Sequence, residues 1–157
     1  MQAGLYVVAT PIGNLGDISS RALEVLGTVD YILAEDTRVS KKLLDHYGVD
    51  TPLVSFHAYN EKAKSTKVLD DIAAEKSVAL ISDAGTPLMR DPGFYLVKEA
   101  QARHINVVSI AGPSAITAAL SIAGVMADTF YFGGFLEAKS SQRIKQLEGL
   151  RSLAASL

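Results

Sequence analysis

The residues of this 157-residue chain that could do chemistry gather in five short segments, at 10–17, 35–38, 57–61, 82–93 and 111–115. Two of these segments carry a pair of carboxylates, and another carries a histidine together with a glutamate. Such side chains can accept a proton as general bases. Three segments combine glycine with proline, which together shape turns whose backbone amides can approach a bound group closely. The pattern predicts a binding site with candidate proton acceptors beside it.

Each segment directly follows a run of apolar residues typical of a β-strand. The predicted strands cover 5–10, 31–35, 53–57, 78–82, 107–110 and 130–132. Between them lie stretches with apolar residues three and four positions apart, which predict helices; Ile18, Ala22 and Val25 are one example. The alternation predicts an α/β fold with a mostly parallel sheet flanked by helices. Because ligands of open α/β sheets bind beyond the carboxyl ends of the strands, the segments are expected to converge at that edge.

Polar residues ahead of the helical stretches are candidate N-caps, since their side-chain oxygens can accept hydrogen bonds from the first free backbone amides. The candidates are Asp17, Ser40, Asn60 and Ser114.

The segment after the fourth predicted strand is the densest of the five. It holds two aspartates, Asp83 and Asp91, between turns stiffened by proline and glycine, which is more restraint than a simple connection requires. This favours a functional role. For the others a structural alternative stays open: a plain turn at 10–17, a helix start with a local ion pair at 35–38, and a surface or capping role for His57.

Composition excludes several kinds of site. Cysteine is absent, which excludes disulfides, thiolate zinc sites and cysteine nucleophiles. No cluster of ligands suggests a metal, so none is expected. There is no stretch of about 20 uncharged apolar residues that could cross a bilayer. The first residues also lack the basic region of a signal peptide. A soluble protein of the cytoplasm, without a membrane partner, is expected.

Charge gives little indication of a nucleic-acid partner. The net charge of −2 does not supply the positive field that attracts phosphate backbones. A local exception lies at 139–151, where four cationic residues accompany only Glu148. A solvated helix face and an RNA-facing edge both remain open for that segment.

Motifs narrow the choice of nucleotide ligands. There is no G-x-x-x-x-G-K-[ST] loop, and the first turn has only Gly13 and Gly16 where a dinucleotide fold has G-x-G-x-x-G. Glu35 and Asp36 nevertheless lie roughly 20 residues beyond that turn, where such a fold keeps its ribose-binding acid. A dinucleotide-binding oxidoreductase therefore remains a weaker alternative.

Five sequence blocks, taken together in this order, resemble the tetrapyrrole methylase superfamily. They read T-P-I-G-N-L-x-D at 10–17, A-E-D-T-R at 34–38, H-x-x-N-E at 57–61, S-D-A-G-T-P-x-x-x-D-P-G at 82–93 and G-P-S-A at 112–115. They are most similar to its ribosomal RNA branch, the small-subunit rRNA (cytidine-2′-O)-methyltransferases. The second and fourth blocks distinguish this branch from the cobalamin and siroheme enzymes. Ala111, where proline is common in relatives, is a minor departure.

The resemblance implies a homodimeric, two-domain enzyme that binds S-adenosylmethionine between its domains and methylates a ribose hydroxyl of 16S rRNA in the small ribosomal subunit. By position it implies a cofactor site at Pro11, Ile12, Gly13, Asn14, Asp83, Gly85, Thr86, Ser114 and Ala115. The family pocket is built largely from backbone groups. The family chain is nearly twice as long, so residues 1–125 are expected to form the cofactor-binding domain and 126–157 a linker and the start of a truncated second domain. Such a chain is expected to fold but to transfer methyl groups poorly or not at all.

Methyl transfer to an oxygen requires that oxygen to lie in line with the sulfonium, and a general base adds about a hundred- to ten-thousandfold. The candidates for a catalytic base, or for orienting the ribose, are Asp36, His57, Glu61 and Asp91. Two other functions remain open: a methylase of a tetrapyrrole or another small molecule, and a non-catalytic domain that binds the cofactor or dimerises.

Overall fold

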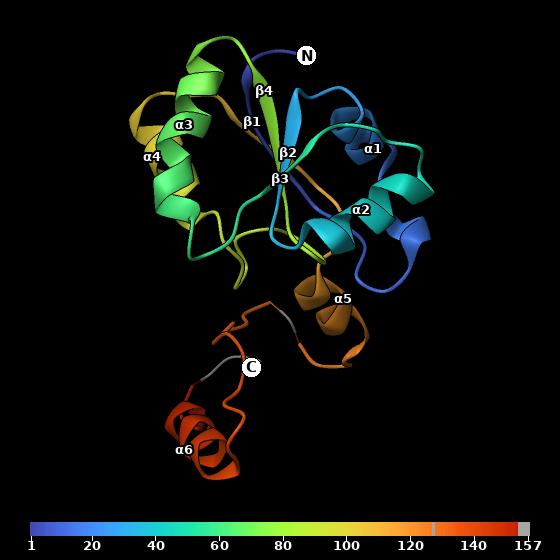
Figure 1. Cartoon of the computed structure of the whole chain (residues 1–157). Coiled ribbons are helices and arrows are strands. Elements are labelled where there is room, and N and C mark those ends of the chain that lie inside the picture. The colour runs from blue at the N-terminus through green and yellow to red at the C-terminus, as the bar shows by residue number, and fades with distance from the viewer. Residues whose placement is uncertain (127, 154–157) are drawn as a thin grey trace. The chain divides into compact units, whose positions relative to one another are not determined.

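The chain divides into two compact units, 1–114 and 115–157 (Figure 1). The computed structural model describes residues 1–126 and 128–153. The first unit holds a β-sheet and four α-helices, and the second holds α5 (Ala115–Ile122) and α6 (Ser140–Leu150). Helix α5 therefore groups with the second unit, ahead of the domain boundary predicted after residue 125. None of the helices in the described ranges has the length and apolar character needed to cross a bilayer.

The sheet of the first unit has five strands, all parallel, in the order β3-β2-β4-β1-β5. The strands are β1 (Gly4–Val8), β2 (Tyr31–Ala34), β3 (Leu53–Ser55), β4 (Ser77–Ile81) and β5 (Val107–Ile110). This confirms the predicted α/β fold with a parallel sheet, and five of the predicted strands lie within two residues of the observed ones.

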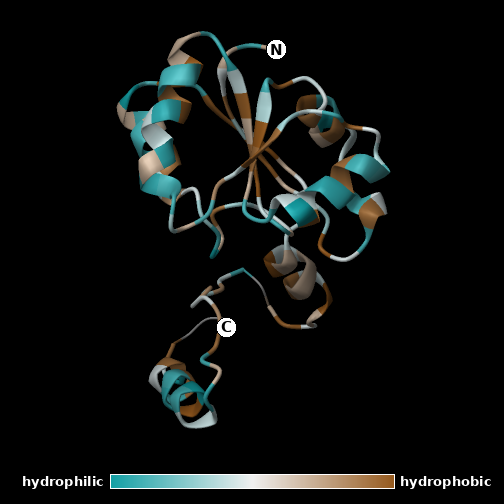
Figure 2. Ribbon diagram, viewed as in Figure 1, coloured by the Kyte–Doolittle hydropathy of each residue, from teal (hydrophilic) through white to brown (hydrophobic). Residues whose placement is uncertain are grey.

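Helices cover both faces of the sheet (Figure 1). On one face lie α1 (Ser20–Leu26) and α2 (Thr37–His46), and on the other lie α3 (Glu61–Ala73) and α4 (Phe94–Ala102). A short 3-10 helix, η1 (Leu15–Asp17), precedes α1. Figure 2 shows apolar strands in the centre and hydrophilic residues on the outer surfaces of the helices, as expected for a sheet buried on both faces.

The two faces of the sheet form two separate cores, because side chains alternate along each strand. In β4, Ala79 and Ile81 pack toward α1 and α2, whereas Val78 and Leu80 pack toward α3 and α4. Every residue of β4 is buried, so this strand lies at the centre of the unit.

Two predicted helix caps are wrong. The Ser19 hydroxyl caps α1 by accepting a hydrogen bond from the Ala22 amide (3.1 Å), because η1 takes up Asp17 before the α-helix begins. Asp36 caps α2, so Ser40 lies inside that helix and is buried. Asn60 does occupy the N-cap position of α3, but its side chain makes no cap hydrogen bond there.

The strand predicted at 130–132 is also wrong. Only Phe130 makes a single bridge, and Tyr131 and Phe132 have no regular structure. A strand needs a hydrogen-bonded neighbour, and the described residues after 114 contain no strand to provide one.

The connections change face at β4, whose neighbours in the sheet are β1 and β2. The chain leaves β1 toward α1 on one face, and it leaves β4 toward α4 on the other. Adjacent strands whose connections depart on opposite faces define the topological switch point at which α/β folds bind ligands.

Candidate functional site

The turns after β1 and β4 are joined by their backbones. The Thr10 amide donates to the Gly85 carbonyl (2.9 Å), and the Gly85 amide donates back to the Thr10 carbonyl (3.0 Å). The buried Thr10 hydroxyl also donates to the Ser82 carbonyl (3.2 Å). These three hydrogen bonds hold the two densest sequence blocks together at the switch point.

Gly85 is required in this arrangement for two reasons. Its φ of +81° lies in the left-handed region, which disfavours residues with a Cβ. A Cβ at this position would also lie 3.3 Å from the Cγ2 atom of Ile12, so a larger residue would push the first turn away. The next residue, Thr86, donates from its hydroxyl to the Pro113 carbonyl (3.2 Å) and so connects the turns after β4 and β5.

An open hollow of about 300 Å³ lies between the turn after β1, helix α2 and the start of the turn after β4. Four of the predicted cofactor residues line it: Pro11, Gly13, Asn14 and Asp83. The remaining lining residues are Leu15, Val39, Lys42 and Leu43.

Sequence reasoning missed the contribution of α2 to this hollow. Val39 and Leu43 are four residues apart and therefore share one face of the helix, and Val39 is 42% exposed. The four-residue spacing in the sequence indicated that these two side chains share a helix face. It does not indicate which turn that face of α2 lies against.

Three carboxylates influence one another at the ends of β2 and β4. Burial raises the pKa of Glu35, the charges of Asp83 and Asp91 raise it further, and His57 opposes the shift. Burial also raises the pKa of Asp91, the Ser82 hydroxyl lowers it, and Asp83 raises it. Asp83 is tied to the end of β2 because its Oδ1 accepts a hydrogen bond from the Asp36 amide (3.2 Å). Glu35 was not among the predicted site residues; it directly precedes Asp36 in the sequence.

Asp36 differs from these carboxylates because both of its carboxylate oxygens accept hydrogen bonds from Arg38 in the same helix. Its Oδ1 accepts hydrogen bonds from the Arg38 amide (2.9 Å) and from Arg38 Nε (3.0 Å). Its Oδ2 accepts a third from Arg38 Nη2 (2.6 Å). The guanidinium holds the pKa of Asp36 well below its usual range, so this side chain is a weak base.

His57 is oriented by Asn60. The His57 amide donates to Asn60 Oδ1 (2.9 Å), while Asn60 Nδ2 lies 3.0 Å from His57 Nε2. With Asn60 as the donor, Nε2 is the acceptor, and the proton of the neutral ring lies on Nδ1. Nδ1 is buried and has no hydrogen-bond partner among the described residues. The ring is thus held in place with one nitrogen unused.

Glu61 contacts the start of α4. Its Oε1 accepts hydrogen bonds from the amides of Gly93 (3.0 Å), Tyr95 (2.8 Å) and Leu96 (3.3 Å). The carboxylate therefore acts as a helix cap provided by a neighbouring helix.

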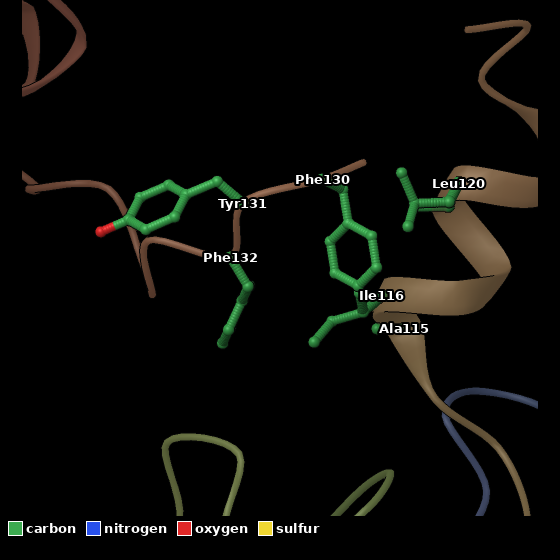
Figure 3. A pocket seen from close by; sticks show the side chains of 7 residues that line it. Ala115, Ile116, Leu120, Phe130, Tyr131 and Phe132 are labelled. Carbon is green, nitrogen blue, oxygen red and sulfur yellow. The ribbon is translucent and has the colours of Figure 1, made fainter. Parts of the chain in front are cut away.

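The last two predicted cofactor residues fall on either side of the division between the units. Ser114 ends the first unit, and Ala115 begins α5 in the second. Within the second unit, Ala115 lines an apolar hollow of about 260 Å³ together with Ile116, Leu120 and the 130–132 segment. Figure 3 shows the Phe130 ring beside this face of α5, while the Tyr131 ring points away. Such a lining suits a flat apolar group.

The acidic character of the carboxyl edge does not amount to a metal site. Across residues 1–126 and 128–153, no three His, Asp or Glu side chains come together in a way that could hold a metal ion.

Most of the chain is similar to known methylases and methyltransferases. The family model described as Tetrapyrrole (Corrin/Porphyrin) Methylases matches residues 4–154. The chain is 51% identical to ribosomal RNA small subunit methyltransferase I of Pseudomonas aeruginosa, over 96% of this chain and 54% of that protein. It is 47% identical to the protein of that name from Escherichia coli O157:H7, over 96% of this chain and 53% of that protein. The chain thus spans about half the length of the curated relatives it matches.

Solved structures share the fold at low sequence identity. A diphthine synthase matches with a TM-score of 0.71 and 18% identity, over 96% of this chain and 61% of that one. Uroporphyrin-III-C-methyltransferase from Thermus thermophilus matches with a TM-score of 0.59 and 18% identity, over 80% of this chain and 53% of that one. At this identity the similarity shows the fold alone.

Proposed function

The chain belongs to the tetrapyrrole (corrin/porphyrin) methylase family, and on this premise we propose that it forms the cofactor-binding part of an S-adenosylmethionine-dependent methyltransferase acting on small-subunit ribosomal RNA. The observation that carries the proposal is the identity of about one half, over more than nine-tenths of this chain, to relatives named for that activity. The resemblance of the five sequence blocks to the family is confirmed.

The residues at the carboxyl edge fit S-adenosylmethionine, which supplies the methyl group as an electrophilic sulfonium. A positively charged donor is stabilised by a negative neighbourhood, and Asp83 and Glu35 provide one. The joined turns would hold the cofactor through backbone groups of Pro11, Ile12, Gly13, Asn14, Gly85 and Thr86. We propose Ser114 and Ala115 as contacts of the same ligand.

Among the four candidate bases we favour Asp91. A carboxyl group with a raised pKa binds a proton more tightly, so Asp91 is the better acceptor for the proton of a ribose hydroxyl. His57 is the candidate for orienting the ribose, because its Nε2 lone pair accepts from Asn60 and its Nδ1 carries the ring proton. Asp36 and Glu61 hold helix starts, and we assign them supporting roles.

The acceptor we propose is the 2′-hydroxyl of a cytidine in 16S rRNA, with the small ribosomal subunit as the partner. The homodimer and the cytoplasmic location are proposed on the family resemblance. The basic segment at 139–151, which includes all of α6, is a candidate RNA contact. Lys145 is exposed there, whereas Arg143 also donates to the carbonyls of Glu137 (3.3 Å) and Ala138 (3.2 Å).

Calorimetric titration with S-adenosylmethionine tests the cofactor site, with a nicotinamide dinucleotide as the control ligand. We expect binding of the former only. Asp83→Asn should weaken that binding, and Asp45→Asn should not, because Asp45 is an exposed aspartate of α2 paired with Lys41 outside the hollow. Binding of neither ligand by the wild type would contradict the proposal.

The substrate is tested by the transfer of labelled methyl groups to small ribosomal subunits that lack this modification, followed by nucleoside analysis. The expected product is 2′-O-methylcytidine. Because the matched family model describes corrin and porphyrin methylases, a porphyrinoid acceptor is the second candidate. Methylation of the porphyrinoid in place of the ribosomal subunit would overturn the RNA assignment.

A further inference from the structure

The segment from Leu88 to Gly93 combines strained backbone with a candidate catalytic carboxylate. Leu88 and Arg90 have φ angles of +72° and +73°, which residues with a Cβ rarely adopt. Strained conformations of this kind persist only where the surroundings hold them in place. Asp91 follows directly, so its position depends on what holds this turn.

Gly93 explains why the turn needs an anchor from elsewhere. It occupies the N-cap position of α4 with a φ of +125°. A Cβ there would lie 2.6 Å from the Cδ2 atom of Leu80 in the sheet, so only glycine fits. Glycine has no side chain to accept hydrogen bonds from the first amides of the helix, and α4 therefore lacks a local cap.

Glu61 supplies the missing cap from a different helix. Its Oε1 accepts the amides of Gly93, Tyr95 and Leu96, which are 32 to 35 residues away in the sequence. The carboxylate also lies at the N-terminus of α4, where negative charge is favourable.

Glu61 is itself firmly placed at the end of β3. Its amide donates to the His57 carbonyl (2.9 Å). Three residues further along α3, Lys64 Nζ donates to the Ser55 carbonyl (2.5 Å). The glutamate therefore links the end of one strand to the turn that follows another.

We propose that Glu61 is a positioning residue that holds the 88–93 turn in place and thereby fixes Asp91 at the carboxyl edge, acting on methyl transfer through Asp91 without touching the substrate. This role rests on the proposed function. A positioning residue differs from a catalytic base, because the Glu61 oxygen accepts hydrogen bonds from backbone amides and does not take the proton of a reacting hydroxyl.

The test compares wild type, Glu61→Gln and Glu61→Ala by NMR, without cofactor or RNA. In Glu61→Ala we expect amide exchange at Gly93, Tyr95 and Leu96 to become about tenfold faster, the loss that corresponds to one hydrogen bond. The pKa of Asp91 should fall toward the usual range as the turn loosens and water reaches the carboxyl; Glu35, Asp83 and Ser82 are the groups that face it. Glu61→Gln keeps an acceptor oxygen and should remain close to the wild type.

Asp30→Asn is the matched control. The Asp30 Oδ2 accepts hydrogen bonds from the amide (2.7 Å) and the hydroxyl (2.8 Å) of Ser77. This contact lies at the amino ends of β2 and β4, away from Asp91. This variant should lose stability and leave the Asp91 titration unchanged. If Glu61→Ala does not fold, Glu61→Asp provides the same readout, since its shorter side chain cannot reach all three amides.

An unchanged Asp91 titration in folded Glu61→Ala, or in Glu61→Asp if the alanine variant does not fold, overturns the proposal, and so does an equal change in Asp30→Asn. In protein that methylates, the kcat losses of Glu61→Ala and Asp91→Asn should not add, with KM for the cofactor unchanged; additive losses would also overturn it. A wild-type chain that neither binds cofactor nor methylates RNA contradicts the proposed function and not the role of Glu61. The NMR comparison can still be interpreted in that case, because it uses neither cofactor nor RNA.

Discussion

Asp91 and Asp36 hold their protons differently because their neighbours differ. Burial and the charge of Asp83 raise the pKa of Asp91, whereas Arg38 holds the pKa of Asp36 well below its usual range. The difference agrees with the proton-acceptor role proposed for Asp91 and with the helix cap that Asp36 provides.

Replacing Asp91 by asparagine should lower methyl transfer by about a hundred- to ten-thousandfold, the contribution of a general base. Cofactor affinity should be unchanged, as measured by calorimetry. Asp36→Asn is the comparison, since asparagine is also a good N-cap, and it should keep most of the activity. If Asp36→Asn proves the more damaging change, the two roles are assigned the wrong way round.

The same Asp91→Asn variant should alter the pH dependence of stability. A carboxyl group whose pKa is higher in the folded state binds more protons when folded, so stability falls as pH rises through that pKa. Asparagine removes this loss, and the variant should gain stability relative to wild type at neutral pH but not in acid below the usual aspartate pKa. Denaturant unfolding at the two pH values measures the difference. A gain of the same size at both would mean that the proton of Asp91 is not its cause.

Gly85→Ala should destabilise the protein by about 1–2 kcal/mol, because alanine is strained at positive φ, and it should also weaken cofactor binding because the Cβ approaches Ile12. Gly48→Ala separates the two effects. Gly48 also has a positive φ (+66°), but a Cβ there meets nothing within 4 Å. Unfolding and calorimetry on both variants should show a shared loss of stability and a loss of affinity in Gly85→Ala alone. Equal affinity in the two variants would argue against the contact with Ile12.

At the scale of elements, the helix starts face the edge where the sequence blocks meet. Helix α1 begins at the Ser19 cap, α2 at Asp36, and α4 at the carboxylate of Glu61. Ser19 also contacts the turn after β5, the amide of Asp36 contacts Asp83, and Glu61 connects α3 to the start of α4. Loss of a cap is therefore expected to disturb the site as well as the helix.

Ser19→Ala should cost about 1 kcal/mol of stability, the usual effect of removing an N-cap hydroxyl. The Ser19 hydroxyl also donates to the Ala111 carbonyl (3.4 Å), so the loss should be accompanied by a change at the turn after β5. Thermal unfolding measures the first effect and amide chemical shifts at 111–114 the second. Ser20→Ala, an exposed neighbour, is the control and should have little effect on either. Similar losses in both variants would mean that Ser19 is not the cap.

At the scale of the whole molecule, the two units differ in how they are stabilised. All buried residues in the described part of the chain lie between Gly4 and Ile110, and most of the buried apolar ones form the two cores on either side of the sheet. The second unit exposes large apolar side chains, among them Ile122 (86%) and Phe135 (67%). The stability of the chain should therefore reside in the first unit.

A shortened chain of residues 1–114 should fold cooperatively and melt within a few degrees of the full chain. The physical reason is that it retains the entire sheet and both cores, which supply the hydrophobic stabilisation. Circular dichroism during heating tests this. A broad, non-cooperative transition would show that the second unit is needed to hold the first together.

The sequence by itself determined the strands, the class of fold and the five segments at the edge of the sheet. These follow from local patterns, since alternating apolar residues indicate which faces are buried, and glycine and proline restrict the backbone where they stand. The run at 130–132 had the same local pattern and still formed no strand, because pairing depends on a neighbour.

Only the tertiary structure decided the strand order, and with it which turns meet. The pairing of Thr10 with Gly85, the interaction of Glu35 with the charge of Asp83 and the cap that Glu61 gives to α4 all join residues that the crossover helices bring together from distant parts of the chain. Local patterns carry no information on such pairings, because the same helices and strands could be connected in another order with every periodicity unchanged.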